Sequence, residues 1–79
     1  MLVVRYFAAA RAAAGCAEEK VTADTLDDLV ATLVATHDEP LARVLSVVSF
    51  LVDGVAWHDR GARLPDGATI DVLPPFAGG

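Results

Sequence analysis

Few side chains in this sequence have the type and spacing that catalysis requires. Its two histidines, His37 and His58, stand far apart, and its one cysteine, Cys16, has no base close to it in the sequence. His37 is predicted to end a helix, where the dipole favours a solvated histidine. His58 is predicted to be exposed at the end of a strand. Cys16 is interpreted as a small apolar residue, buried or half-exposed, rather than as a nucleophile.

The acidic residues give no stronger signal. Glu18 and Glu19, and then Asp27 and Asp28, are adjacent pairs that we interpret as solvated faces rather than as a convergent acid and base. The sequence also lacks a phosphate loop and a glycine-rich dinucleotide fingerprint. It therefore predicts no metal site and no cofactor bound by the chain itself, and a domain that does not catalyse a reaction alone.

The end of the sequence, LPPFAGG, is the remaining candidate for chemistry. Pro74 and Pro75 favour an extended path away from the preceding strand. From Pro74 to Gly79 such a chain reaches roughly 20 Å. Gly78 and Gly79 have no Cβ, so they could thread a tunnel too narrow for side chains. Activated as an acyl adenylate, the carboxylate of Gly79 could be attacked by a sulfur or oxygen nucleophile, although glycines can also end a chain without any function.

The elements that would position this tail follow from local patterns. Strands are predicted at 2–7, 17–23, 49–54 and 68–73, with a short return strand after the Asp53-Gly54 turn. A short helical segment at 8–15 ends at Gly15. A tight turn is predicted at Pro65-Asp66-Gly67.

The clearest helix begins after Thr25, the expected N-cap, with Asp28 in the position of a capping box. Apolar residues at three- and four-residue spacings give it one buried face. Pro40 is expected to stop it, and 41–48 is ambiguous, with a second short helix as one interpretation.

This order predicts an α+β fold, a β-grasp (ubiquitin-like) mixed sheet with one main helix packed on one face. In it the first and last strands lie side by side and parallel at the centre. Residues 1–73 would form the domain and 74–79 a flexible, extended Gly-Gly tail.

Composition limits the partners. The chain has 79 residues, is 54% hydrophobic and carries a formal charge of −5, which fits one small packed domain. The negative charge argues against nucleic acid, because affinity for phosphate backbones depends on clustered Lys and Arg. The apolar N-terminus is short and contains arginines, so neither a signal peptide nor a membrane span is predicted. The single cysteine favours a reducing, cytoplasmic location.

The C-terminal LPDG-ATIDVLPPFAGG resembles the signature of the small subunit of molybdopterin synthase, the MoaD family of ubiquitin-like sulfur carriers in the MoaD/ThiS superfamily. The N-terminal VVRYFAAARAAAG is similar to the start of that family. The resemblance implies that Gly79 is adenylated and then converted to a thiocarboxylate, which donates sulfur to a pyranopterin precursor in molybdenum cofactor biosynthesis.

The resemblance also implies partners. They are the large subunit of molybdopterin synthase, in a heterotetramer, a ubiquitin-activating-like adenylyltransferase, and a sulfur donor protein. ATP and Mg²⁺ would be used by the activating enzyme and not by this chain. The tail that would insert into the large subunit consists of Pro74, Pro75, Phe76, Ala77 and Gly78, ahead of the reactive Gly79.

Four residues are predicted at the partner interface. Phe7 and Arg11 match the Phe-Ala-x-x-Arg stretch of the family, and the resemblance implies that they lie near the partner face. Leu73 stands where the family often has an aromatic residue, with Phe76 following the prolines instead. Trp57 is added because exposed aromatics are enriched among interface anchors, the alternative being a partly buried residue at the rim of the domain.

Alternative functions remain open. A sister carrier for cysteine or thiamine biosynthesis would share the activation step and differ in its acceptor, although the Pro-Pro pair argues against a thiamine carrier. A ubiquitin-like modifier joined to lysines, or a plain interaction module, belongs to a different class.

Overall fold

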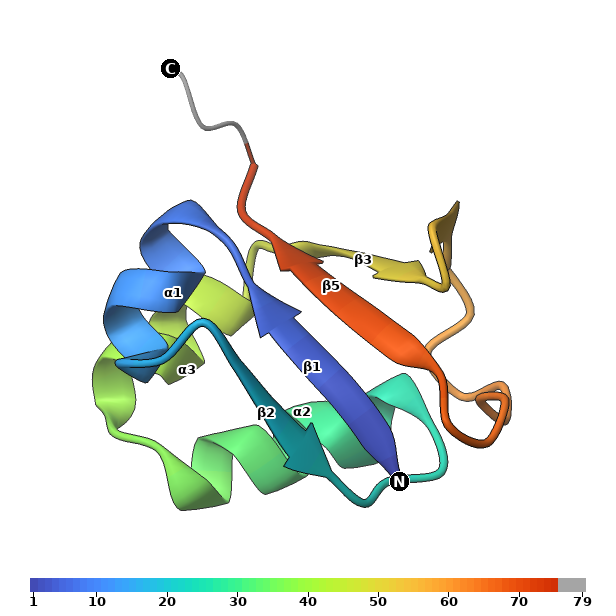
Figure 1. Cartoon of the computed structure of the whole chain (residues 1–79). Coiled ribbons are helices and arrows are strands. Elements are labelled where there is room, and N and C mark those ends of the chain that lie inside the picture. Colours follow the sequence, from blue (N-terminus) through green and yellow to red (C-terminus); the bar gives the residue numbers. More distant parts are fainter. Residues whose placement is uncertain (76–79) are drawn as a thin grey trace.

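The computed structural model describes residues 1–75. Its helices and strands, in chain order, are β1 (Leu2–Tyr6), α1 (Ala8–Ala14), β2 (Glu18–Val21), α2 (Leu26–Thr36), α3 (Glu39–Leu45), β3 (Ser49–Val52), β4 (Val55–Ala56) and β5 (Thr69–Leu73). The strands form one five-stranded mixed sheet in the order β2-β1-β5-β3-β4. Figure 1 shows the three helices gathered on one side of this sheet.

The first and last strands form the centre of the sheet, as predicted. β1 and β5 are parallel, with Val4 opposite Ile70, while the neighbouring pairs are antiparallel. Because these two strands run in the same direction, they end at the same edge of the molecule. The exit of the chain from β5 therefore lies beside the turn from β1 into α1.

Alternation along the strands gives the sheet two different faces. Residues such as Val4, Ile70 and Val72 are fully buried against the helices. Between them, Arg5 is exposed and Asp71 is half-buried on the opposite face, which no helix covers. We call this second side the open face. The buried core of residues 1–75 contains no charged side chain.

The predicted helix start and glycine end are confirmed. Thr25 Oγ1 accepts a hydrogen bond from the backbone N–H of Asp28 at 3.1 Å, which caps α2. Gly15 ends α1 in the left-handed region, with φ of +78°, where a residue without Cβ is favoured. None of the helices within residues 1–75 is long and apolar enough to cross a membrane.

The prediction that Pro40 stops the main helix is wrong. The helix α2 already ends at Thr36, with His37 as its C-cap in an extended conformation. Pro40 instead lies in the first turn of α3. Proline is tolerated there because the first N–H groups of a helix have no intrahelical partner. The ambiguous segment is thus a second helix, which begins earlier than the sequence indicated.

Both predicted turns are present. Asp53 and Gly54 both have positive φ, of 48° and 84°, as a two-residue hairpin of type I′ requires. Gly67 has φ of +76°, and the N–H of Ala68 bonds to the carbonyl of Pro65 at 3.3 Å. The Asp53-Gly54 turn sets the register of β3 with β4, and the second turn leads the chain into β5.

Candidate functional site

The open face ends in a small exposed area where β1 and β5 finish together. The backbone N–H of Phe7 donates to the carbonyl of Val72 at 3.3 Å, which holds the two strand ends side by side. By alternation the side chains of Phe7 and Leu73 lie on the open face, and both are half-buried. We call this area, with Arg11 and Pro74, the strand-end rim.

Arg5 positions the aromatic ring of the rim. Its Nε lies 3.2 Å from Asp71 Oδ1 of the neighbouring strand, and its guanidinium carbon lies 5.4 Å from the ring centre of Phe7. A cation over an aromatic face is attracted by the ring quadrupole. Sequence reasoning did not include Arg5, although its place two residues before Phe7 on a strand puts both on one face.

A sharp change of direction follows Phe7. Ala8 has φ of +49°, an uncommon value for a residue with a Cβ, and the chain turns there from β1 into α1. On α1, Arg11 is exposed. A shallow groove lies between α1 and β2, lined by Arg5, Phe7, Ala8, Arg11 and Glu18 among others. The rim thus brings together two of the predicted interface residues, Phe7 and Leu73, with Arg11 beside them.

The tail begins at this rim. Pro74 is half-buried and Pro75 is exposed, and Figure 1 shows the red end of β5 leaving the sheet beside the loop that leads into α1. The remaining predicted tail residues lie outside the described residues: Phe76, Ala77, Gly78 and Gly79.

Trp57 lies elsewhere. Its backbone N–H donates to the carbonyl of Phe50 at 3.1 Å, so it continues the ladder one residue beyond the Leu51 and Ala56 pair. Because the side chain of Phe50 is buried in the core, this register places Trp57 on the helix-covered side, where it packs against the core. The indole N–H donates to the carbonyl of Asp59 at 3.0 Å. The structure therefore does not bring Trp57 together with Phe7.

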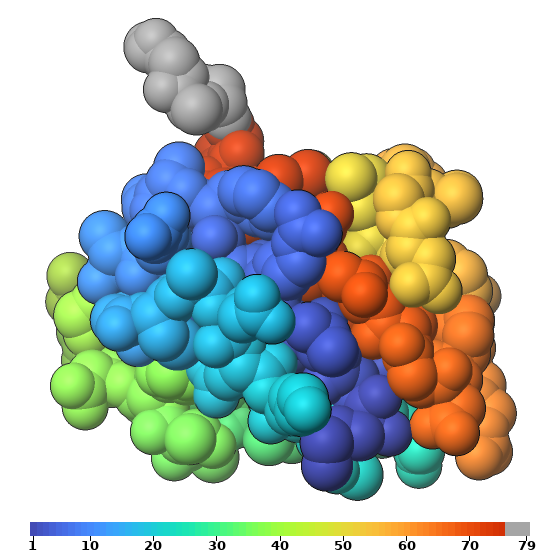
Figure 2. All heavy atoms as spheres, in the orientation of Figure 1, coloured from blue at the N-terminus to red at the C-terminus, as the bar shows by residue number. Residues whose placement is uncertain are grey.

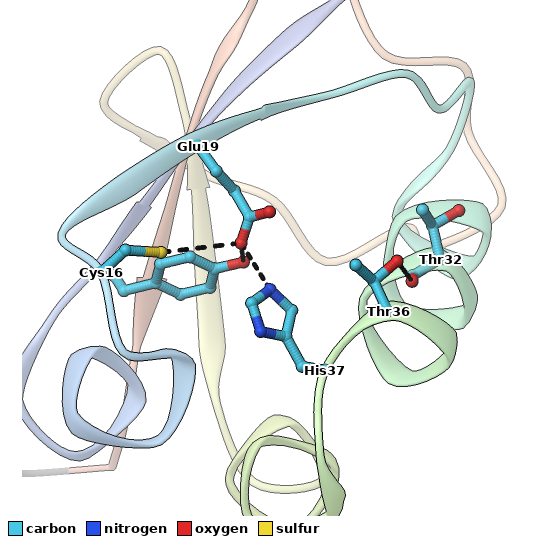
Figure 3. A network of polar contacts seen from close by, with 6 residues as sticks. Cys16, Glu19, Thr32, Thr36 and His37 are labelled. Atoms are coloured by element: carbon cyan, nitrogen blue, oxygen red, sulfur yellow. Dashed lines mark hydrogen bonds and ion pairs between the residues drawn. The ribbon is translucent and has the colours of Figure 1, made fainter.

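A polar cluster lies on the helix-covered side at the other edge of the sheet (Figure 3). Glu19 Oε2 accepts a hydrogen bond of 2.6 Å from the Tyr6 hydroxyl and lies 2.6 Å from His37 Nε2. Cys16 Sγ lies 3.8 Å from the same oxygen. We call Tyr6, Cys16, Glu19 and His37 the Glu19 cluster.

Two predictions about this cluster are wrong. His37 is not a solvated helix end, because its side chain is only 16% exposed and pairs with Glu19. The side chain of Glu19 is 25% exposed rather than part of a solvated acidic face. The alternation of β2 turns Glu19 toward the helices, opposite Val4, and the end of α2 places His37 against it. Nothing in the local sequence connects these two residues.

The contacts of the cluster stabilise the protonated forms of Tyr6 and Cys16 and the ionised form of Glu19. Burial, followed by the hydrogen bond to Glu19, raises the pKa of Tyr6 well above its ordinary value. Burial and the nearby charge of Glu19 raise the pKa of the Cys16 thiol. For Glu19 itself burial acts in the opposite direction, but the hydrogen bonds from Tyr6 and His37 outweigh it and lower the pKa below 4.5. Cys16 is thus held as a thiol, a poor nucleophile.

The described residues show how each predicted chemical group is placed. Within residues 1–75 no three His, Cys, Asp or Glu side chains are arranged to hold a metal ion. His58 is exposed just beyond β4. Cys16 is half-buried beside a carboxylate that disfavours its thiolate. The strand-end rim is the place where the main chain leaves the folded domain and continues toward Gly79.

Comparisons with known proteins agree with this architecture. A family model described as the ThiS family matches residues 4–79. A chain in the complex of subunits 1 and 2 of the molybdopterin-converting factor from Helicobacter pylori 26695 is 27% identical, covering 99% of this chain and 97% of that one, with a TM-score of 0.75. SAMP1 from Haloferax volcanii is 26% identical, covering 99% and 98%, with a TM-score of 0.76.

A curated relative is larger than this chain. The bifunctional protein FolD of Parafrankia sp. (strain EAN1pec) is 35% identical over 69 residues, which cover 87% of this chain and 25% of that protein. The chain therefore spans about a quarter of the length of the curated relative that it matches. The two solved structures, in contrast, match this chain over nearly their full lengths. These matches confirm the predicted β-grasp fold, which in this chain has one mixed sheet with helices on one side.

Proposed function

This chain belongs to the ThiS family, and from that premise we propose that it carries sulfur on its C-terminal glycine as the small subunit of a molybdopterin synthase. It has the fold of the MoaD/ThiS sulfur carriers. The observation that supports the more specific role is the match over nearly the whole chain to a component of the Helicobacter pylori molybdopterin-converting factor, which was solved as a protein–protein complex.

The proposed chemistry takes place on the main chain. A carboxylate oxygen of Gly79 attacks the α-phosphorus of ATP, with Mg²⁺ supplied in the activating enzyme, and pyrophosphate leaves. A sulfur nucleophile from a donor protein then attacks the acyl carbon, and AMP leaves. When that nucleophile is the outer sulfur of a persulfide on the donor, a thiol next attacks the donor's inner sulfur and the S–S bond of the acyl disulfide breaks. A disulfide forms on the donor and the C-terminus leaves as a thiocarboxylate, which passes its sulfur to a pyranopterin precursor bound by the large subunit.

The role proposed for the folded domain is to present this terminus to partners. The rim offers Phe7 and Leu73 as apolar contacts and Arg11 as an exposed cation where the tail leaves β5. Aromatic residues and arginine are both enriched in protein–protein interfaces. Pro74 and Pro75 restrict the chain beyond the rim and so reduce the entropy lost when the tail is inserted.

A second function is favoured by a specific comparison. The similarity to SAMP1, the small archaeal modifier protein 1 of Haloferax volcanii, supports a ubiquitin-like modifier, whose activated glycine would be attacked by a lysine amine instead of by sulfur. Sister carriers for cysteine or thiamine biosynthesis remain alternatives with another sulfur acceptor.

Reconstitution with defined components separates these functions. The carrier is prepared with a C-terminal thiocarboxylate and mixed with a molybdopterin synthase large subunit and the pyranopterin precursor. We expect dithiolene formation and the return of the carrier to its carboxylate. A thiocarboxylate that persists with this acceptor but is consumed in cysteine or thiamine synthesis would contradict the molybdopterin role. Lysine-linked adducts, formed when the unmodified carrier is given ATP, an activating enzyme and protein acceptors, would favour the modifier.

A further inference from the structure

The edge strand β2 presents backbone groups that have no partner within the described residues. In the antiparallel pair of β1 and β2, Tyr6 N–H donates to the carbonyl of Ala17, and Val4 lies opposite Glu19. Since hydrogen-bonded and non-hydrogen-bonded pairs alternate, the N–H and C=O groups of Glu18 and Lys20 point away from β1. Such an edge is a template for another strand.

The side chains on this edge are oppositely charged and exposed. Glu18 and Lys20 both lie on the open face, because the residue between them, Glu19, turns toward the helices. Within residues 1–75 neither of them makes an ion pair. Figure 2 shows the light-blue and cyan atoms of this segment uncovered on the viewed face. A lone lysine on an edge strand disfavours pairing with another strand. Here Glu18, two residues from Lys20, supplies a charge of the opposite sign.

We propose that β2 pairs edge to edge with β2 of a second copy of this chain. In a two-fold antiparallel register centred on Glu19, Glu18 of each copy lies opposite Lys20 of the other, which gives two pairs of opposite charge. The outward backbone groups of these same residues then exchange hydrogen bonds. The sheet would continue from one copy into the other. This interaction goes beyond the proposed carrier function and does not depend on it.

The neighbouring registers are less favourable. Sliding one copy by two residues in either direction keeps the outward backbone groups paired. It places Glu18 opposite Glu18, or Lys20 opposite Lys20, on the open face. Like charges directly opposite one another destabilise a strand pair. The charges therefore select the register centred on Glu19.

On the helix-covered face, repulsion between two glutamates limits the affinity of the pairing. In this register the two Glu19 side chains are opposite one another on the helix-covered side. Each is already bonded to Tyr6 and His37 of its own copy, which reduces the repulsion. The paired segment has only four residues, so the interface is smaller than the ~1,200 Å² of stable specific complexes. Self-association is expected only at high protein concentration.

The geometry leaves the proposed reactive ends accessible. β2 is antiparallel to β1, and β1 is parallel to β5, so the pairing of two β2 strands makes the two β5 strands run in opposite directions. The two strand-end rims then lie at opposite ends of the joined sheet. Each copy can engage its own partner while the edges are paired.

Charge reversal tests the proposal. Sedimentation analysis of the full chain is carried out over a concentration series up to about millimolar. The wild type is expected to self-associate, and Lys20→Glu and Glu18→Lys are each expected to weaken association by roughly tenfold or more. The double variant E18K/K20E restores opposite charges across the pair and is expected to restore association.

Controls make the result specific. Arg63→Glu changes the net charge as much as Lys20→Glu does, but at an exposed loop position away from β2, and should leave association unchanged. Hydrogen exchange of the wild type gives a second measurement that needs no variant, since the amides of Glu18 and Lys20 should become protected as concentration rises. A wild type that stays monomeric throughout, or a double variant no better than the single ones, would overturn the proposal.

Discussion

The Glu19 cluster and the strand-end rim lie on opposite faces of the same sheet and use their polar groups differently. In the cluster, Tyr6 and His37 both bond to one oxygen of Glu19. At the rim, Arg11 is exposed and makes no ion pair within residues 1–75, while Phe7 is half-buried under the guanidinium of Arg5. The first region satisfies its groups internally, and the second leaves them free to meet another protein.

From this difference we expect the Glu19 cluster to contribute to stability and the strand-end rim to contribute to recognition. Groups that bond to each other inside the fold contribute mainly to the free energy of unfolding, since removing one leaves another unsatisfied. Groups at an exposed strand end contribute little to folding and are available for recognition. Changes at the rim and the tail should therefore alter sulfur transfer, and changes in the cluster should alter stability.

The largest expected effect is at the tail. Deleting Gly79 should abolish sulfur transfer, because the carboxylate would then belong to Gly78 and be one residue short of the activating site. The midpoint of thermal unfolding should not change, because the buried core ends at Val72. Single-turnover transfer assays and calorimetry measure the two effects. A truncated chain that unfolds early would show that the tail is structural.

The next effect compares two aromatic residues on opposite faces. Phe7→Ala should weaken binding of the large subunit about tenfold or more, since interface anchors contribute at least 1–2 kcal/mol. Trp57→Ala should instead lower stability and leave affinity unchanged, because Trp57 packs against the core. Titration calorimetry with both variants checks this. Equal losses of affinity would show that the partner contacts both faces.

The cluster gives a purely structural prediction. Glu19→Ala should lower the free energy of unfolding by about 1–3 kcal/mol, because the buried Tyr6 hydroxyl loses its acceptor. Its exposed neighbour provides the matched control, since Glu18→Ala should change stability by no more than about 0.5 kcal/mol at low protein concentration. Denaturant titration measures both. Sulfur transfer that falls with Glu19→Ala under conditions where the variant is folded would contradict the separation of roles.

A smaller effect should appear on acidification. The folded-state pKa of Glu19 lies below its ordinary value of 4.5, so its contribution to stability is fully present above about pH 4.5. That contribution is lost as the pH falls through the folded-state pKa. The stability difference between the wild type and Glu19→Gln should therefore narrow at acidic pH. Urea titrations from neutral to acidic pH check this, and a constant difference would contradict the assignment.

The smallest effect concerns Cys16. Because burial and Glu19 raise the pKa of its thiol, alkylation by iodoacetamide at mildly alkaline pH should be slower than that of an unhindered thiol. Glu19→Gln removes the charge and should speed alkylation a few-fold, provided that the variant is folded. The rate is measured by mass spectrometry. No change would mean that burial alone controls this thiol.

Much of the fold follows from local patterns in the sequence. The alanine-rich run closed by Gly15, the Thr25 cap and the Asp53-Gly54 turn each correspond to one backbone geometry, and all three are found. Pro40 was misinterpreted because proline is suited both to ending a helix and to the first turn of the next. Local sequence does not separate these two positions.

The Glu19 cluster and Trp57 differ in how far the sequence predicts their positions. Glu19 and His37 are eighteen residues apart, and only the packing of α2 against β2 brings them together. The side of Trp57 could have been predicted, because counting back through the two-residue turn pairs Val52 with Val55, Leu51 with Ala56, and then Phe50 with Trp57. The strand register therefore shows on which face of the sheet Trp57 lies, whereas its residue type does not.

Intact-mass measurement and fragmentation test whether the chain carries sulfur on its C-terminal glycine. The full chain is incubated with its activating enzyme, ATP and a sulfur donor, and the modified peptide is identified. We expect one oxygen to be replaced by sulfur in the peptide that contains Gly79, and Cys16 to be unchanged. A whole sulfur atom added to the peptide that contains Cys16, with the Gly79 peptide unaltered, would contradict this expectation and place the carrier chemistry in the Glu19 cluster.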